Sequence, residues 1–174
     1  MELSEQALYR LSSQHKLIKS YLHDLPAEAI NKKEITDQES IHEIIACIYS
    51  NQYAFINCIT AITTHVAPLI EIYKADTDSQ KSFILAKTNR SLLREIYRLR
   101  KDIIFMLQRL PANQASRIGI HPVLGKMNLC QWLEIFLLYE CRQLFKIFKI
   151  ACIIRISESS YDHVRYMPWM RRNN

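Results

Sequence analysis

The sequence has very little glycine and lacks the usual signals of a β-hairpin. Only two of its 174 residues are glycine, Gly119 and Gly125, and its five prolines fall between apolar periodic segments. No Asn-Gly or Asp-Gly dipeptide occurs, although these pairs mark most tight hairpins. Scarce glycine, with proline confined to connections, is typical of long helices joined by loops. These absences predict an all-α protein.

Paired cysteines and long uncharged apolar runs are also missing. The five cysteines are odd in number and follow no Cys-x-x-Cys spacing, and the first residues do not resemble a secretion signal. No uncharged apolar run approaches the ~18 residues that a membrane span needs. We therefore expect a soluble cytoplasmic protein with reduced thiols and no membrane partner.

The composition is that of a globular chain with a surplus of basic residues. Hydrophobic residues make up 49% and charged residues 23%, and the formal net charge is +6. The densest basic segment, residues 90–102, places Arg94, Arg98 and Lys101 on one helical face. We interpret this face as a solvated surface. A nucleic-acid-binding module is the alternative, but no zinc-finger or RNA-recognition pattern supports it, so nucleic acid is not an expected partner.

Four segments show the alternating steps of three and four residues that amphipathic helices require. They cover residues 4–25, 41–62, 88–110 and 128–154. The second and fourth begin with capping boxes, Ser40 with Glu43 and Asn128 with Gln131. A short helix is expected after Asp78. Together the segments predict a four-helix bundle over residues 1–156, followed by a tail, residues 157–174, without periodicity.

Polar side chains interrupt two of the apolar stripes. Tyr139 and Gln143 lie one turn apart in the stripe of the fourth helix, and His15 lies in the stripe of the first. Burying polar groups is costly, so each needs a reason. For His15 we favour a core histidine with one hydrogen bond, and a place in a pocket is the alternative.

Two stretches resemble the DinB-like proteins, a superfamily of DinB/YfiT metalloenzymes. They are SIHEIIACIYSNQYAFINCI (40–59) and IHPVLGKMNLCQWLEIFLLYECRQLFKI (120–147), and the resemblance extends over about residues 4–156. Proteins of this family are similar in having a four-helix core in which three histidines hold nickel or zinc. One histidine comes from the second helix and two from the fourth, as His-x-x-x-His. The resemblance implies hydrolase or thiol-transferase chemistry and a homodimer.

None of the three matching positions in this chain is histidine. They are Cys47, Tyr139 and Gln143. A thiolate is a good zinc ligand, whereas a phenol and an amide bind divalent ions weakly. We therefore interpret the three residues, with Asn51, as a hydrogen-bonded cluster in a lost metal site. We expect no cofactor and a role in binding or assembly, with an unknown small molecule as a candidate ligand.

A metal-dependent hydrolase or thiol transferase with altered ligands is the alternative, with nickel or zinc as the metal. His15 and His121 could reach the mouth of the pocket. Glu140 and Cys141 are expected to point away from it, because successive helical residues rotate by about 100°.

A cysteine enzyme is a further alternative. Cys47 would be the nucleophile and Gln143 would donate to an oxyanion. No histidine lies one helical turn from Cys47 to act as its base, which weakens this hypothesis.

Overall fold

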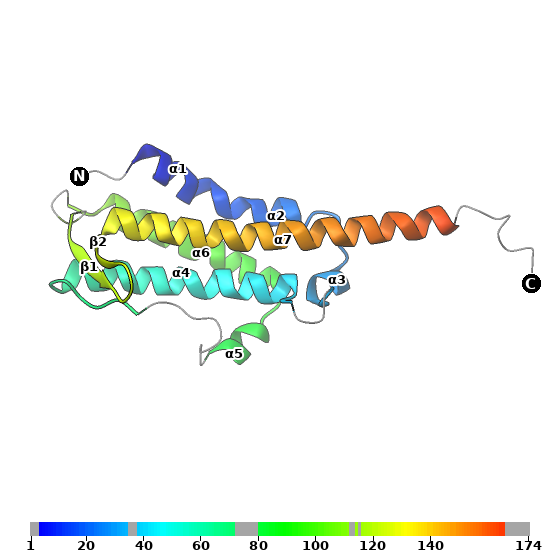
Figure 1. The fold of residues 1–174 in the computed structure, drawn as a ribbon, viewed down its shortest axis with the longest axis horizontal. Helices are drawn as coiled ribbons and strands as arrows, with labels where there is room; N and C mark the ends of the chain where they lie inside the picture. The colour runs from blue at the N-terminus through cyan, green and yellow to red at the C-terminus, as the bar shows by residue number, and fades with distance from the viewer. Residues whose placement is uncertain (1–3, 35–37, 72–79, 112–113, 115, 166–174) are drawn as a thin grey trace, which may run out of the picture.

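The computed structural model describes residues 4–34, 38–71, 80–111, 114 and 116–165, with side chains up to residue 157. Figure 1 shows long helices lying side by side, with α7 extending beyond the others at the C-terminal end. The three longest helices are α4 (Ile41–Thr64), α6 (Asn89–Gln108) and α7 (Leu129–Arg165). Within the described residues, no helix is both long enough and apolar enough to cross a membrane.

The N-terminal segment takes the fourth place in the bundle. It is a nearly continuous helix divided into α1 (Glu5–Ser13), the 3-10 turn η1 (Gln14–Lys16) and α2 (Leu17–Tyr21). Two short helices lie in the connections, α3 (Ala27–Asn31) and α5 (Lys81–Leu85). The predicted four-helix bundle is therefore confirmed, and α5 is the short helix expected after Asp78.

Both predicted capping boxes are present. The Ser40 hydroxyl accepts from the N–H of Glu43 at 3.2 Å, and the Glu43 carboxylate accepts from the N–H of Ser40 at 2.7 Å. At the start of α7, Asn128 and Gln131 exchange the same two bonds at 3.0 and 2.9 Å. These bonds satisfy N–H groups that the first helical turn leaves without partners. They fix the starts of α4 and α7, which carry most of the site described below.

The connection after Pro111 contains a β-hairpin, which the sequence analysis did not predict. Strand β1 (Ile118–His121) pairs antiparallel with β2 (Gly125–Asn128). Gly125 has a φ of 77°, a left-handed conformation that glycine adopts without strain. A three-residue loop closed by a left-handed residue is a common hairpin connection, so the missing Asn-Gly pair did not exclude a hairpin.

The hairpin packs on one end of the bundle, beside the start of α7 (Figure 1). The N–H of Ile120 donates to the carbonyl of Pro68 at 2.7 Å, and the N–H of Ile70 donates to the carbonyl of Ile120 at 2.9 Å. Gly119 permits a close approach of the hairpin to α4 and to the segment after it. A Cβ at this position would lie 2.9 Å from the Ile62 side chain and 3.0 Å from that of Ile70. The last residue of β1 is thereby held against α4.

Helix α7 is longer than its sequence pattern predicted. The apolar stripe ends at Ile154, yet the helix continues to Arg165, into the segment that we expected to be an aperiodic tail. An established helix gains one backbone hydrogen bond for each residue added, and this does not require an apolar stripe. Residues 166–174, the remainder of the expected tail, lie outside the described residues.

The interior contains two apolar clusters with a polar layer between them. Ile48, Leu99 and Leu144 belong to the first cluster, and Phe55, Ile103 and Leu137 belong to the second. The polar layer consists of Gln52, Arg100 and Glu140, each at most 1% exposed.

In this layer Arg100 and Glu140 form an ion pair. Arg100 also donates to the Gln52 side chain at 3.2 Å and to the carbonyl of Leu11 at 3.0 Å, and Gln14 donates to Glu140 at 3.0 Å. Glu140 is not among the residues that line the pocket between α4 and α7, as expected, but its side chain is fully buried on another face of the helix. Helix α7 packs against the N-terminal segment as well as α4, so its buried arc is wider than one stripe.

Candidate functional site

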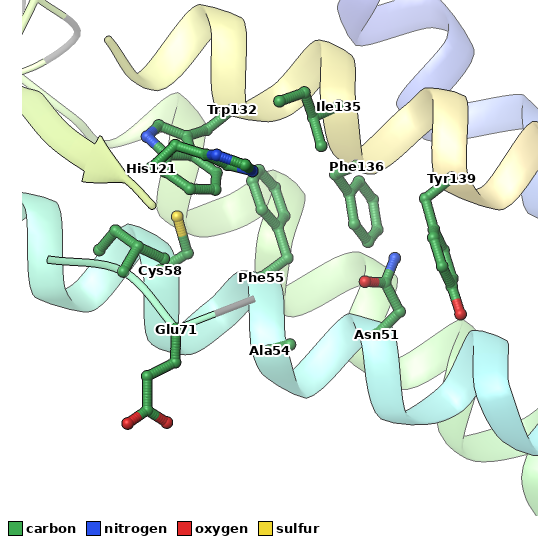
Figure 2. Close-up of a pocket in the computed structure, with 11 residues that line it drawn as sticks. Asn51, Ala54, Phe55, Cys58, Glu71, His121, Trp132, Ile135, Phe136 and Tyr139 are labelled. Atoms are coloured by element: carbon green, nitrogen blue, oxygen red, sulfur yellow. The ribbon is translucent and has the colours of Figure 1, made fainter. Parts of the chain in front are cut away.

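A pocket of about 90 Å³ lies between α4 and α7, next to the hairpin (Figure 2). It is lined by residues of α4, of the segment after α4, of β1 and of α7: Asn51, Ala54, Phe55, Cys58, Ile70, Glu71, His121, Trp132, Ile135, Phe136 and Tyr139. At ~30 Å³ per water molecule this volume holds about three waters. The pocket therefore suits a side-chain-sized part of a ligand.

Aromatic rings form the walls of the pocket. Phe55 of α4 stacks on Phe136 of α7 with ring centroids 4.3 Å apart, and His121 packs on Trp132 at 5.3 Å. The guanidinium carbon of Arg100 lies 4.9 Å from the centroid of the Phe136 ring. The buried ion pair thus supports one wall of the pocket from behind.

His121 is arranged to donate a hydrogen bond and not to bind a metal. Its Nδ1 accepts the N–H groups of Val123 at 3.1 Å and Leu124 at 3.0 Å. A ring nitrogen that accepts carries no proton, so the neutral ring has its proton on Nε2. A metal bound through Nε2 would require that proton on Nδ1, towards which two backbone donors already point.

Asn51 supplies a second donor. Its Nδ2 is buried and has no hydrogen-bond partner among the described residues. Figure 2 shows the Asn51 amide directed from α4 towards the rings of Phe136 and Tyr139. An unsatisfied buried amide is unfavourable, and an acceptor atom of a ligand would relieve the cost.

Three of the six candidate residues from the sequence therefore line one pocket: Asn51, His121 and Tyr139. Cys47 and Gln143 are buried but are not among its lining residues. The Oε1 of Gln143 has no hydrogen-bond partner in the described part of the chain. A cluster that joins Cys47, Tyr139 and Gln143 stays a prediction.

His15 lies in a different part of the bundle. Its ring is 4% exposed and packs edge-on against Tyr97 of α6, with centroids 4.8 Å apart. Burial, followed by the positive charges of Arg100 and Lys16, lowers the pKa of His15 to about 4. His15 is thus a neutral core histidine at neutral pH and does not line the pocket.

The two buried cysteines of α4 are poor nucleophiles. Burial, followed by the neighbouring Glu39 carboxylate, raises the pKa of Cys47 to about 11. Burial raises the pKa of Cys58, which lines the pocket, to about 12. Both thiols are therefore protonated at neutral pH, and the thiolate is the reactive form.

Sequence reasoning missed Trp132, Phe55 and Cys58 as pocket residues because they read as ordinary core positions. His121 was expected near the pocket, because it begins the segment from His121 to Gly125 in one of the two stretches that resemble the DinB-like proteins. No group of three or more His, Cys, Asp or Glu side chains that could hold a metal ion occurs in the part of the chain that the structure describes.

These features define a four-helix bundle of the YfiT-like type with an aromatic pocket. The structure reported as "YfiT from Bacillus subtilis is a probable metal-dependent hydrolase with an unusual four-helix bundle topology" matches with a TM-score of 0.75. The match covers 86% of each chain at 12% sequence identity, so it shows a common fold and nothing finer. No family model and no curated protein matches the sequence. The predicted resemblance is therefore confirmed at the level of the fold.

Proposed function

We propose that this protein binds, without a metal ion, the flat apolar end of a small molecule that carries a hydrogen-bond acceptor. The proposal is carried by Nδ2 of Asn51, which lies between aromatic walls and has no hydrogen-bond partner among the residues that the structure describes. The rings provide an apolar surface for a planar group, and the amide provides direction.

The balance of donors and acceptors in the pocket supports an acceptor on the ligand. Asn51 and the Nε2–H of His121 are donors. Glu71 is the carboxylate among the lining residues, and Figure 2 shows its side chain extending away from the rings. A carbonyl or carboxylate group therefore matches the pocket better than an ammonium group.

A nickel or zinc ion does not fit the residues at the positions that match the family's histidines. Cys47 is the one good zinc ligand of the three, whereas Tyr139 and Gln143 bind divalent ions weakly, and one strong ligand does not hold a catalytic ion. A metal-dependent hydrolase or thiol transferase is therefore the second candidate function. The observation in its favour is the fold shared with YfiT.

Metal analysis separates the two candidates. The purified chain would be incubated with zinc and with nickel, desalted and analysed for bound metal. We expect far less than one ion per chain. One ion per chain that is lost in Cys47→Ala would overturn the metal-free proposal.

A pair of matched probes tests the ligand class. Benzamide carries a carbonyl acceptor and toluene does not, while both present one aromatic ring of side-chain size to the pocket. We expect protein NMR shifts at Trp132 with benzamide, and about tenfold weaker binding in Asn51→Leu, because one hydrogen bond to a ligand is lost. Gln108→Leu, an equivalent change at an exposed position of α6, is the control. Equal affinity of both probes for the native chain would count against the role of Asn51.

Assembly is a further role that one surface supports. Leu138, Phe145 and Ile156 on α7 are 60%, 61% and 66% exposed. Apolar side chains that share one face are typical of contact surfaces, so we propose this face for the homodimer that the family resemblance implies. Light scattering should show a dimer that Phe145→Glu dissociates, whereas Phe83→Glu, at a residue of α5 that is 70% exposed, leaves it intact. A native chain that is monomeric in solution would refute the proposed dimer.

A further inference from the structure

A second cavity lies away from the aromatic pocket, between the N-terminal segment and α6. It is an open groove of about 570 Å³ lined by Lys16, Lys19, Ser20, His23 and Tyr97. Sites for small molecules commonly measure about 300–1,000 Å³. The groove is therefore large enough for a whole small molecule, whereas the pocket between α4 and α7 takes only a side-chain-sized part of one.

The lining of this groove is basic and includes no carboxylate. Lys16 and Lys19 are exposed, and neither forms an ion pair with a residue that the structure describes. His23 contacts the adjacent Asp24, which places one acidic group at the rim. Ser20 adds a hydroxyl group that can donate to an anion.

Helix α6 adds positive charge close to the groove. Arg94 and Lys101 lie three residues before and four residues after Tyr97, so all three side chains share one helical face. Both basic residues are exposed and have no ion pair within the described ranges. Arg98 differs, because it pairs with Asp102 at 3.0 Å. Cations in and around a groove reinforce one another in attracting anions.

The half-buried Tyr97 of α6 also lines the groove. The buried His15 ring packs edge-on against the Tyr97 ring, with centroids 4.8 Å apart, and so restricts its movement. The groove thus combines an aromatic surface with positive charges that have no ion-pair partner among the described residues. This combination suits a ligand with a ring and several negative charges.

We propose that this groove binds a phosphate-bearing small molecule, with the phosphate oxygens at Lys16, Lys19 and Ser20 and the remainder of the ligand against Tyr97. Phosphate groups fit because each offers several acceptor oxygens and more than one negative charge. Arg94 and Lys101 raise the local potential without needing direct contact. This site is independent of the aromatic pocket.

Calorimetric titration of the full chain with sodium tripolyphosphate and with ATP tests the proposal. At low salt we expect saturable binding of both probes, and we expect it to weaken at higher salt because exposed charges are screened. Lys16→Ala with Lys19→Ala should weaken binding about tenfold, since two ion pairs are lost. Lys126→Ala with Lys149→Ala removes the same charge from exposed positions elsewhere and should leave affinity nearly unchanged.

The two probes also separate the phosphate from the ring. If ATP binds more tightly than tripolyphosphate and Tyr97→Leu removes the difference, the ring of the ligand packs on Tyr97. If the native chain binds ATP and tripolyphosphate equally tightly, the site recognises the phosphates alone. The proposal fails if neither probe binds, or if both double variants weaken binding equally. It also fails if a single-stranded RNA binds while neither small probe does, because the groove would then belong to a nucleic-acid surface.

Discussion

Arg100 on α6 and Glu140 on α7 neutralise each other inside the bundle, where their side chains are 1% and 0% exposed. Gln52 bonds to both side chains and so completes the polar layer. Charges buried away from water are stable only when their partner is present, because desolvating each one costs several kcal/mol. The pair also supports Phe136, so this layer joins the core to the pocket wall.

Removing one member of this pair should destabilise the fold strongly. We expect Arg100→Met to lower the free energy of unfolding in urea by about 3–5 kcal/mol, because Glu140 is left buried without a counter-charge. Arg100→Met combined with Glu140→Leu should recover much of this loss. Arg98→Ala, which breaks the exposed pair with Asp102, is the control and should cost less than ~1 kcal/mol. If Arg100→Met lowers the free energy of unfolding by as little as Arg98→Ala does, Arg100 and Glu140 do not form a buried ion pair.

Local signals in the sequence predicted the helices well. Ser40 with Glu43, and Asn128 with Gln131, identify helix starts because each capping box is completed within four residues of the chain. The apolar stripes likewise depend only on spacing along one helix. Features of this kind need no knowledge of what packs against the helix.

Features that depend on distant segments were missed or misplaced. Glu140 is buried because Arg100 and Gln14, far away in sequence, approach it, and helical rotation alone cannot reveal these partners. The hairpin depends on Gly119 fitting against Ile62. The pocket was predicted only in part, because Phe55, Cys58 and Trp132 occupy positions that the spacing along one helix marks only as core.

His15 should make the protein sensitive to mild acid. Its pKa is about 4 in the fold and about 6.5 in an unfolded chain. Above about pH 6.5 the histidine is neutral in both states and has no effect on stability. As the pH falls from about 6.5 to about 4, only the unfolded chain gains the proton, so the free energy of unfolding drops by at most about 3 kcal/mol.

Urea unfolding between these pH values, compared between the native chain and His15→Leu, measures this effect. The variant should lose less stability than the native chain over the same interval. Val66→Ala, at a residue that is 91% exposed and has no ionisable group, is the control and should retain the native pH dependence. Parallel pH profiles for the native chain and His15→Leu would show that His15 is not the group responsible.

Gly119 should be less tolerant of substitution than Gly125. A Cβ at Gly119 would lie 2.9 Å from the Ile62 side chain, so Gly119→Ala should push the hairpin away from α4 and cost about 1–3 kcal/mol. Gly125 has open space around it and a φ of 77°, which asparagine tolerates. Thermal unfolding should therefore show a larger loss for Gly119→Ala than for Gly125→Asn. The reverse order would mean that the hairpin does not pack on Ile62.

The cysteines should differ widely in their reaction with iodoacetamide. Cys141 is exposed, whereas Cys47 and Cys58 are 7% and 4% exposed. A thiol with a pKa of about 11, as for Cys47, contains only ~0.1% thiolate at pH 8. Peptide mass spectrometry over a time course should find Cys141 modified first and Cys47 and Cys58 modified last.

The same labelling in urea, where all the cysteines are accessible, controls for differences in peptide detection. Cys141→Ser should remove the fast phase and leave the slow sites unchanged. Rapid modification of Cys47 in the folded chain would have a different meaning, because it requires a thiolate that burial and Glu39 disfavour. That result would restore Cys47 as a candidate nucleophile or zinc ligand, and the metal analysis of Cys47→Ala would then decide between these two roles.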